Sequence, residues 1–333
     1  MRCGMRVVLT GGAGFIGSHI AEALLRQGHT VLIIDDLSTG QRDFISKYAK
    51  FVQASILDPA CAKAIASFHA DAIVHQAAQI DVAKSMQDPA SDIKVNFSGT
   101  LAILEAARPN KTPIVFASSA AVYGDNPDIP LCEDADTYPI STYGVSKLSS
   151  ELICKAYERT HGVPCVALRY SNVYGPRQAT RGEGGVVSVF IRALLQDKVP
   201  TIYGTGEQTR DFVYVEDVAD ANMAALSWLL KNRHGAVVNV STGRQTSIID
   251  LHKQVAKRMS SSPACQQQPV MADTRAGDIM HSSLDPTKAQ GIFEWQAATA
   301  LSDGLRHTIS YFRAQADGRE GDASKRDASK GDA

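Results

Sequence analysis

The chain has 333 residues, 44% of them hydrophobic, and a formal net charge of −1 at pH 7. This length allows one large core, or one nucleotide-binding domain with a smaller region beside it. The near-neutral charge gives no sign of attraction to nucleic acid or to a membrane surface. No stretch approaches the run of about 20 apolar residues that a membrane span needs, so we expect neither partner.

Cysteine usage and the N-terminus bear on cellular location. The six cysteines show no C-x-x-C spacing, and we interpret them as reduced thiols rather than metal ligands or disulfide partners. They are Cys3, Cys61, Cys132, Cys154, Cys165 and Cys265. The N-terminus leads directly into a predicted strand, without a signal peptide. We therefore expect a cytoplasmic protein with no metal site.

A complete β-α-β unit follows a short N-terminal extension, residues 1–5. The apolar run 6–10 predicts a strand, helical periodicity continues to a stop at Gly28, and residues 31–34 predict the next strand. Between the first strand and the helix lies the glycine-rich turn 11–17. Glycines there let the backbone approach a pyrophosphate, and the helix N-terminus offers free N–H groups and a partial positive charge. This unit predicts a dinucleotide site.

Asp35 indicates which dinucleotide is bound. It ends the second predicted strand, eighteen residues past Gly17, where a carboxylate can accept hydrogen bonds from the adenosine ribose. A negative charge at this position would repel a 2′-phosphate. The sequence therefore favours NAD over NADP.

Strand and helix continue to alternate as far as residue 170. We predict strands at 51–53, 72–75, 114–117 and 164–168, with helices at 90–107 and 143–160. This alternation predicts an α/β fold with a mostly parallel, doubly wound (Rossmann) sheet, and an NAD-binding domain over residues 6–170. His75 ends one of these strands without an obvious partner, so we interpret it as structural.

A hydroxyl, a phenol and an ammonium group form a candidate catalytic set. Ser119 follows the predicted strand 114–117, and Tyr143 and Lys147 lie one turn apart on the next helix, with Ser141 or Thr142 as its N-cap. A phenol is a poor base because its ordinary pKa is about 10, but a nearby ammonium favours the phenolate and lowers that pKa. The three groups together can pass a proton to or from a sugar or alcohol hydroxyl.

The pattern changes after Arg169. Glycine-rich breaks at 175–177 and 182–185 interrupt the alternation, and residues 210–213 lead into a helix that begins near Glu216. We predict that residues 171–313 form a smaller, mainly substrate-binding region, interleaved with the first domain. From residue 314 the chain is polar and nearly repeats 321–325 as 326–330, so a disordered tail is predicted for 314–333.

From about Arg6 to Phe312 the chain resembles the extended short-chain dehydrogenases/reductases, and most closely their UDP-glucose 4-epimerase branch. Beside the Ser119/Tyr143/Lys147 set, the motifs that carry the resemblance are Thr10-Gly11-Gly12-Ala13-Gly14-Phe15-Ile16-Gly17-Ser18-His19, Asn96 before Gly99-Thr100, Arg169-Tyr170-Ser171-Asn172-Val173-Tyr174-Gly175-Pro176 and Gly204-Thr205-Gly206-Glu207-Gln208-Thr209-Arg210-Asp211-Phe212.

The resemblance implies roles for particular residues. Catalysis falls to Ser119, Tyr143 and Lys147. The cofactor NAD would be contacted by Gly11, Gly14, Phe15, Ile16, Gly17, Asp35, Ser38, Thr39, Gly40, Ser55, Ile56, Ala77, Ala78, Gln79, Asn96, Tyr143, Lys147 and Tyr170. The UDP-sugar would be contacted by Ser119, Tyr143, Asn172, Val187, Tyr203, Arg210, Arg275, Asp278 and Ser282.

The resemblance also implies a mechanism. Tyr143 as phenolate takes the proton of the sugar 4-hydroxyl while the C4 hydride passes to NAD, and the 4-keto sugar turns over and takes the hydride back on its other face. Ser119 would hydrogen-bond near O4, and Lys147 would hold the nicotinamide ribose. Arg210 and Arg275 would grip the diphosphate, to which a guanidinium donates two hydrogen bonds.

Three positions depart from the family pattern or vary within it. Ser55 stands where an Asp often contacts the adenine amino group, and Ser171 replaces a usual Phe, which predicts a looser nicotinamide pocket. Ser282 stands where relatives restricted to plain hexoses tend to carry a bulky Tyr. A small residue leaves room for a 2-acetamido group, so the sequence predicts activity on N-acetyl sugars as well.

Single positions argue against other activities of the superfamily. Nucleotide-sugar 4,6-dehydratases usually carry Asp-Glu where Ser119-Ala120 stands, and UDP-glucuronate decarboxylases carry a Glu at Ala120 or Ala121. A UDP-hexuronate 4-epimerase shares the Ser/Tyr/Lys chemistry and remains the alternative. A non-catalytic NAD-sensing regulator would be expected to have lost Tyr143 or Lys147.

A homodimer is the last expectation. The predicted helices 90–107 and 143–160 carry apolar residues on more than one face, so one face can pack on the sheet and another on a two-fold mate. These residues are Ile103, Leu104, Leu148, Leu152, Ile153 and Tyr157.

Overall fold

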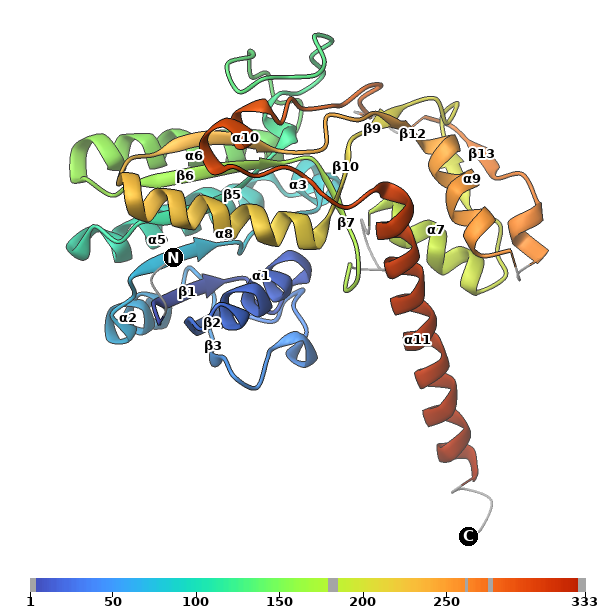
Figure 1. Cartoon of the computed structure of the whole chain (residues 1–333), viewed down its shortest axis with the longest axis horizontal. Coiled ribbons are helices and arrows are strands. Elements are labelled where there is room, and N and C mark those ends of the chain that lie inside the picture. Colours follow the sequence, from blue (N-terminus) through green and yellow to red (C-terminus); the bar gives the residue numbers. More distant parts are fainter. Residues whose placement is uncertain (1–3, 179–184, 261–262, 275–277, 329–333) are drawn as a thin grey trace.

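The computed structural model describes the chain except for residues 1–3, 179–184, 261–262, 275–277 and 329–333. Its centre is a seven-stranded parallel sheet with strand order β11-β6-β5-β4-β1-β2-β3 (Figure 1). The strands are β1 (Arg6–Thr10), β2 (Thr30–Asp35), β3 (Lys50–Gln53), β4 (Ala72–His75), β5 (Ile114–Ser119), β6 (Cys165–Tyr170) and β11 (Ala236–Val240). The order reverses between β1 and β4, which is where doubly wound sheets bind their ligands.

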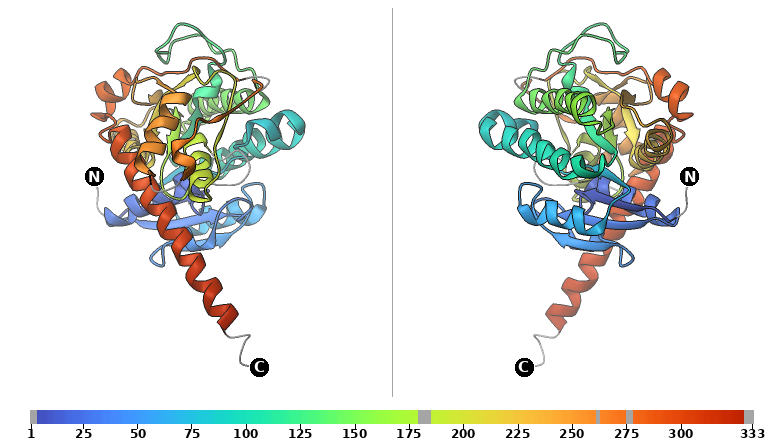
Figure 2. Two further views of the ribbon diagram at one scale, coloured as in Figure 1. Left: turned by 90° about the vertical axis from the view of Figure 1, so that its right-hand side faces the viewer. Right: turned by 90° about the vertical axis from the view of Figure 1, so that its left-hand side faces the viewer.

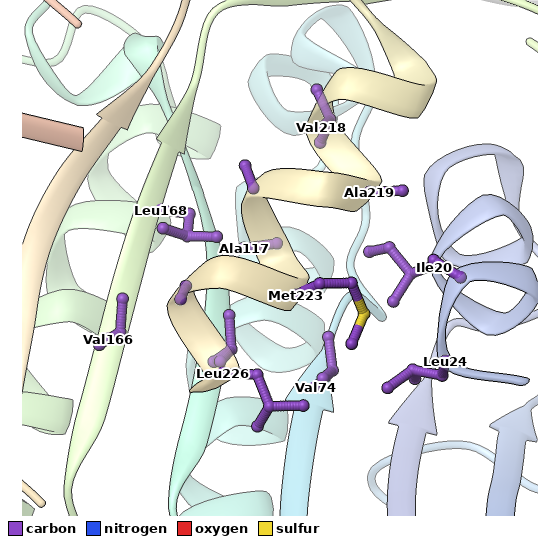
Figure 3. Packing of buried hydrophobic residues seen from close by; sticks show 14 of the residues in the cluster. Ile20, Leu24, Val74, Ala117, Val166, Leu168, Val218, Ala219, Met223 and Leu226 are labelled. Carbon is purple, nitrogen blue, oxygen red and sulfur yellow. The ribbon is translucent and has the colours of Figure 1, made fainter. Parts of the chain in front are cut away.

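Helices cover both faces of this sheet. One face carries α1 (Phe15–Arg26), α8 (Val215–Asn232) and α10 (Thr287–Phe293), and the other carries α2 (Pro59–Phe68), α5 (Gly99–Ala107) and α6 (Thr142–His161). Successive strand residues point to opposite faces, so Val7 and Leu9 pack under α1 while Val8 packs on the other side. Figure 3 shows Met223 of α8 among Ile20 and Leu24 of α1. The predicted doubly wound sheet is confirmed.

A smaller region lies beside the carboxyl ends of the strands and faces the viewer in the left panel of Figure 2. It has its own apolar core. Its strand pairs are β7 (Asn172–Tyr174) with β10 (Phe212–Tyr214), β8 (Thr201–Tyr203) with β13 (Val270–Ala272), and β9 (Thr209–Arg210) with β12 (Thr246–Ser247). Its helices are α7 (Val186–Leu195) and α9 (Ile248–Arg258). Between these pieces the chain returns to the main sheet to form α8 and β11.

Most predicted elements agree with the structure to within two residues. The N-cap of α6 is Ser141, whose Oγ accepts a hydrogen bond from Gly144 N at 3.1 Å. The helix ends at Gly162, whose φ of 70° is the left-handed conformation that favours glycine. His75 is buried, with Nδ1 2.7 Å from Thr10 Oγ1 and Nε2 3.2 Å from Thr100 Oγ1, which fits a structural role.

The predicted helix 90–107 is not one regular helix. It consists of α4 (Pro89–Ile93), a π-helical turn η2 (Lys94–Ser98) and α5. At the wide turn, two hydroxyls donate to the Asn96 carbonyl, Thr100 Oγ1 at 2.6 Å and Ser150 Oγ at 3.3 Å. π-Turns are frequent at functional sites, and this one turns Asn96 toward the loop after β4.

The prediction of a disordered tail from residue 314 is wrong as far as residue 328. Helix α11 (Leu301–Ala328) continues through this stretch and extends away from the body of the molecule (Figure 1). Residues 314–328 contain four alanines and no proline that would stop the helix begun at Leu301, although their three aspartates and two glycines are weak helix formers. Residues 329–333 lie outside the described residues. Among the helices that the structure describes, none is long and apolar enough to cross a bilayer.

The remaining helical segments are short. They are η1 (Arg42–Phe44), α3 (Val82–Gln87), η3 (Arg108–Asn110), η4 (Ala120–Val122) and η5 (Pro263–Gln266).

Candidate active site

The turn between β1 and α1 forms a tight backbone cradle. Gly11 has φ of +69°, and a Cβ there would lie 2.6 Å from Ala77 N; a Cβ at Gly17 would lie 2.1 Å from Gly11 O. Only glycine fits such close approaches. Gly14 is the N-cap of α1 and no side chain caps this helix, so its first-turn N–H groups are left for a bound group to satisfy. The turn fits the pyrophosphate of a dinucleotide.

Asp35 is fixed at the end of β2, beside this cradle. It is buried, and its carboxylate accepts from Ala13 N at 3.0 Å and from Leu37 N at 2.8 Å. Burial raises the pKa of Asp35, while these two hydrogen bonds act to lower it. Each carboxylate oxygen keeps a further lone pair for a ribose hydroxyl. A Cβ at Gly40 would lie 2.8 Å from Asp35 Oδ1, so the 38–40 turn passes directly over the carboxylate.

The loop after β4 lines the other side of the cradle and is held by Asn96. Gln79 N donates to Asn96 Oδ1 at 2.8 Å, and Asn96 Nδ2 donates back to Gln79 O at 3.0 Å. Ala77 N donates to Thr10 Oγ1 at 3.3 Å, and Ala78 lies between these two anchors. The Asn96 side chain, predicted to contact the cofactor, is thus committed to positioning the loop.

Ser55 and Ile56 follow β3 at the edge of the cradle. Ser55 Oγ accepts from Leu57 N at 3.3 Å, and a hydroxyl can still offer a second lone pair to an amino group. Ile56 is buried, and a Cβ at Gly99 would lie 2.4 Å from its Cδ1. Ile56 is therefore wedged against the start of α5.

Ser119, Tyr143 and Lys147 are brought together by β5 and α6. Ser119 ends β5, its Oγ accepts from Ala121 N at 3.2 Å, and its hydroxyl acts to lower the pKa of the Tyr143 phenol. Lys147 is buried, its Nζ lies 5.8 Å from the centre of the Tyr143 ring, and it donates to Ala117 O at 2.8 Å. The predicted set is a spatial cluster at the carboxyl end of the sheet.

The protonation of this cluster differs from the expectation. Burial raises the pKa of Tyr143 to about 12 and lowers the pKa of Lys147 to about 8. The Ser119 hydrogen bond acts to lower the Tyr143 value, and the charge of Asp92 acts to raise both. Burial thus moves the pKa of Tyr143 in the direction opposite to the one predicted from Lys147, whose Nζ lies 5.8 Å from the centre of the Tyr143 ring.

Tyr170, predicted to contact the cofactor, lies in a polar cluster behind the loop after β4. Its ring packs in the core beneath α8, and its hydroxyl donates to Asn222 Oδ1 at 3.0 Å and accepts from Gln76 Nε2 at 3.0 Å. Burial raises the pKa of Tyr170 to about 12. This buried polar cluster of Gln76, Tyr170 and Asn222 ties the loop after β4 to α8, a link that sequence reasoning missed.

The predicted substrate-binding residues gather around β9. Arg210 forms an ion pair with Asp278 and donates to Thr209 O at 2.8 Å, and Ser282 N donates to the same Thr209 O at 3.2 Å. Burial lowers the pKa of Arg210. A diphosphate bound at Arg210 would therefore either displace Asp278 or share the guanidinium with it. Arg275 lies outside the described residues.

Three other predicted substrate contacts are more dispersed. Asn172 is exposed at the start of β7, where its N donates to Asp211 O at 2.9 Å. Tyr203 on β8 is partly exposed, whereas Val187 on α7 is buried in the core of the smaller region. The Val187 side chain therefore packs in the apolar core of the smaller region.

The segment 282–284 connects this group to the catalytic cluster. Leu284 is buried against Val122, which follows Ser119 by three residues, and Ser283 O accepts from Leu131 N at 2.9 Å. Ser282 thus lies between β9 and the Ser119 turn. Within the described residues, no group of histidine, cysteine or acidic side chains could hold a metal ion.

The fold and the glycine cradle are those of a dinucleotide-binding enzyme. The model of the NAD dependent epimerase/dehydratase family matches residues 7–241. The chain belongs to this family, its cofactor is NAD, and the enzyme is similar to UDP-glucose 4-epimerases.

Curated relatives of different named activity are similar over nearly the full length. A UDP-glucose 4-epimerase of Mycolicibacterium smegmatis is 38% identical, covering 93% of this chain and 99% of the relative. A UDP-N-acetyl-alpha-D-glucosaminuronate decarboxylase of Bacillus cytotoxicus is 33% identical, covering 92% and 98%.

Solved structures are equally similar. The UDP-glucose 4-epimerase of Thermotoga maritima with UDP-glucose matches with a TM-score of 0.88 and 37% identity, covering 93% of this chain and 99% of that one. The UDP-N-acetylglucosamine 4-epimerase of Methanobrevibacter ruminantium matches with a TM-score of 0.87 and 33% identity, covering 94% and 100%.

Proposed function

We propose that this enzyme interconverts UDP-glucose and UDP-galactose by inverting C4, and that it also interconverts the corresponding N-acetyl sugars. The observation that carries the proposal is the cluster of Ser119 at the end of β5 with the buried Tyr143 and Lys147 of α6, beside a cradle that fits NAD. The names of relatives at 37% and 38% identity point to the same reaction.

In this proposal Tyr143, Ser119 and Lys147 have different roles in the transfer of the proton. Tyr143 takes the proton of the sugar 4-hydroxyl and later returns it, and Ser119 hydrogen-bonds both the phenol and the sugar oxygen. Lys147, anchored on Ala117 O, directs its remaining N–H groups toward the ribose and the phenol. When bound, NAD supplies the acceptor and the donor of the C4 hydride.

Binding of the nucleotide is assigned to the predicted substrate-binding residues around β9. Arg210 presents a guanidinium that can exchange Asp278 for diphosphate oxygens, with Arg275 as the second predicted cation and Asn172 and Tyr203 nearer the sugar and the uracil. Ser282 is only partly buried, and its small side chain would leave room for a 2-acetamido group on a sugar bound beside it. The named UDP-N-acetylglucosamine 4-epimerase among the similar structures supports this breadth.

A UDP-hexuronate 4-epimerase is the second candidate, because the relative from B. cytotoxicus is named for a UDP-hexuronate substrate. Decarboxylation itself is disfavoured by the absence of an acid at Ala120 and Ala121. Incubation with UDP-galactose, UDP-N-acetylgalactosamine and UDP-galacturonate, with products identified by NMR, tests the proposal. Turnover of UDP-galacturonate alone would replace it with the second candidate.

We also propose that the protein is a cytoplasmic homodimer. Ile103 and Leu104 pack on the sheet, but a band of large apolar side chains on α3, α4 and α6 is exposed. This band consists of Val82, Met86, Ile93, Val145 and Leu152, exposed by 38–57%. A two-fold mate would cover it. Light scattering should give a dimer at micromolar concentration, and Leu152→Glu should weaken it; a monomeric wild-type protein would contradict the proposal.

A further inference from the structure

Asp92 is a fully buried carboxylate whose bonding is incomplete. It lies on α4, and Oδ1 accepts from Gln79 Nε2 at 2.8 Å and from Asn96 Nδ2 at 3.1 Å. Oδ2 is buried and has no hydrogen-bond partner among the described residues. A buried carboxylate needs compensation by a cation or by several donors, so half of this group is left uncompensated by hydrogen bonds.

Two cations and two carboxylates are buried in and behind the catalytic cluster, and one cation is already paired with one carboxylate. Arg169 Nε and Nη2 donate to the two oxygens of Glu151 at 2.9 and 2.7 Å, and Ser118 Oγ donates to Glu151 at 2.5 Å. The remaining cation is Lys147 and the remaining carboxylate is Asp92. Within the described part of the chain, neither forms a direct ion pair.

A chain of polar contacts links Asp92 to the turn of α6 that carries Lys147. Asn96 Nδ2, which donates to Asp92, also lies 3.1 Å from Ser146 Oγ, and Ser146 Oγ donates to the Tyr143 carbonyl at 3.0 Å. Asp92 is therefore fixed to the same turn of α6 that carries Tyr143 and Lys147. Its charge reaches both, because it acts to raise the pKa of each.

We propose that Asp92 is the buried counter-charge of Lys147 and acts as a positioning residue for the Tyr143–Lys147 pair. The proposal concerns how the proposed epimerase site is set, and so it rests on the proposed function. Asp92 favours the charged form of Lys147 in a site where burial disfavours it. The same carboxylate accepts a hydrogen bond from the Gln79 side chain and so also holds the loop after β4.

The other charged groups that face the pair do not replace Asp92. Glu151 acts in the same direction on the pKa of Lys147, but its two oxygens are taken by Arg169. His75 on β4 is held neutral, because burial and Lys147 lower its pKa to about 3. The Phe116 ring, 5.1 Å from Lys147 Nζ, adds only a weak cation–π attraction.

The sign of the effect follows from the charges. Removing a negative charge makes the ammonium of Lys147 less favourable, so its pKa falls below its present value of about 8. The same removal makes the Tyr143 phenolate more favourable, so the Tyr143 pKa also falls. Both limbs of the pH profile of kcat/KM should therefore move to lower pH.

The test uses Asp92→Asn and Asp92→Ser in the purified holoenzyme. Carbon-13 NMR of lysine-labelled protein follows the titration of Lys147, whose signal is the one missing from Lys147→Arg. We expect the titration midpoint to fall by about one pH unit in both variants. The pH profile of kcat/KM should shift in the same direction. Two variants are used because either one could fold poorly, which thermal unfolding would reveal.

Asp88→Asn is the matched control. It removes one negative charge from the N-cap of the same helix, where Asp88 is exposed and accepts from Ser91 N at 3.1 Å, and asparagine caps equally well. The control should leave the midpoint and the profile unchanged. Uniformly lower kcat in the Asp92 variants, with an unshifted midpoint, would overturn the proposal. Because the NMR titration needs no substrate, loss of the proposed function would leave this test intact.

Discussion

Asn96 and Gln79 exchange two hydrogen bonds, Gln79 N to Asn96 Oδ1 at 2.8 Å and Asn96 Nδ2 to Gln79 O at 3.0 Å. The amide side chain thus pairs with the backbone of the loop as a neighbouring strand would. Asn96→Ala should destabilise the fold by about 1–3 kcal/mol, because it leaves both backbone groups unpaired. It should also weaken NAD retention, since this loop lines the cradle. Thermal unfolding and cofactor release measure the two effects; a variant that retains NAD normally would contradict the assignment.

Asp35 should set the preference for NAD over NADP. The purified protein should release NAD on denaturation, and Asp35→Asn should narrow the preference by removing the charge that repels a 2′-phosphate while keeping an acceptor for Ala13 N. Titration of the stripped protein with each cofactor measures the ratio. Release of NADP, or activity with NADP only, would show that this interpretation of Asp35 is wrong.

Tyr143→Phe removes only the oxygen that transfers the proton. Because the ring and its packing remain, the fold and UDP-sugar binding should be nearly unchanged, while turnover should fall by about 10⁴-fold, at the upper end of the range for acid–base groups. Steady-state kinetics and binding of UDP to the variant measure these effects separately. Near wild-type turnover would remove Tyr143 from the mechanism.

Ser282→Tyr should separate the two classes of substrate. A phenol ring at this position fills the space that a 2-acetamido group needs, so turnover of UDP-N-acetylgalactosamine should be suppressed, while the UDP-galactose rate should change much less. The ratio of the two kcat/KM values is the measurement. Equal loss of both activities, or a wild-type enzyme inactive on N-acetyl sugars, would mean that Ser282 does not face the sugar.

For the buried ion pair of Glu151 and Arg169, replacing one partner should destabilise the protein more than replacing both. Glu151→Gln leaves the guanidinium without its counter-charge and should destabilise the protein by about 3–5 kcal/mol. Replacing both residues by leucine should recover a large part of that loss. Denaturant unfolding of the single and double variants forms the comparison, and additive effects would contradict this coupling.

The sequence predicted most of the fold and the core of the site because those features depend on local patterns. Tyr143 and Lys147 share a helix face through their spacing, and the glycine turn with Asp35 follows from one β-α-β unit. The Gln76–Tyr170–Asn222 cluster joins residues up to 146 positions apart, and no local pattern encodes it. The direction of the Tyr143 pKa shift was also out of reach, because it depends on how completely tertiary packing removes water.

Strand β11 (Ala236–Val240) forms one edge of the main sheet, although the chain enters it only after building β7 to β10 of the smaller region. During synthesis, the outer edge of β6 therefore has no partner strand until residue 240 has left the ribosome. Such an edge is open to pairing with other chains. A fragment ending near residue 170 should thus aggregate rather than behave as a free cofactor-binding module, and the two regions cannot be exchanged between relatives at a single junction.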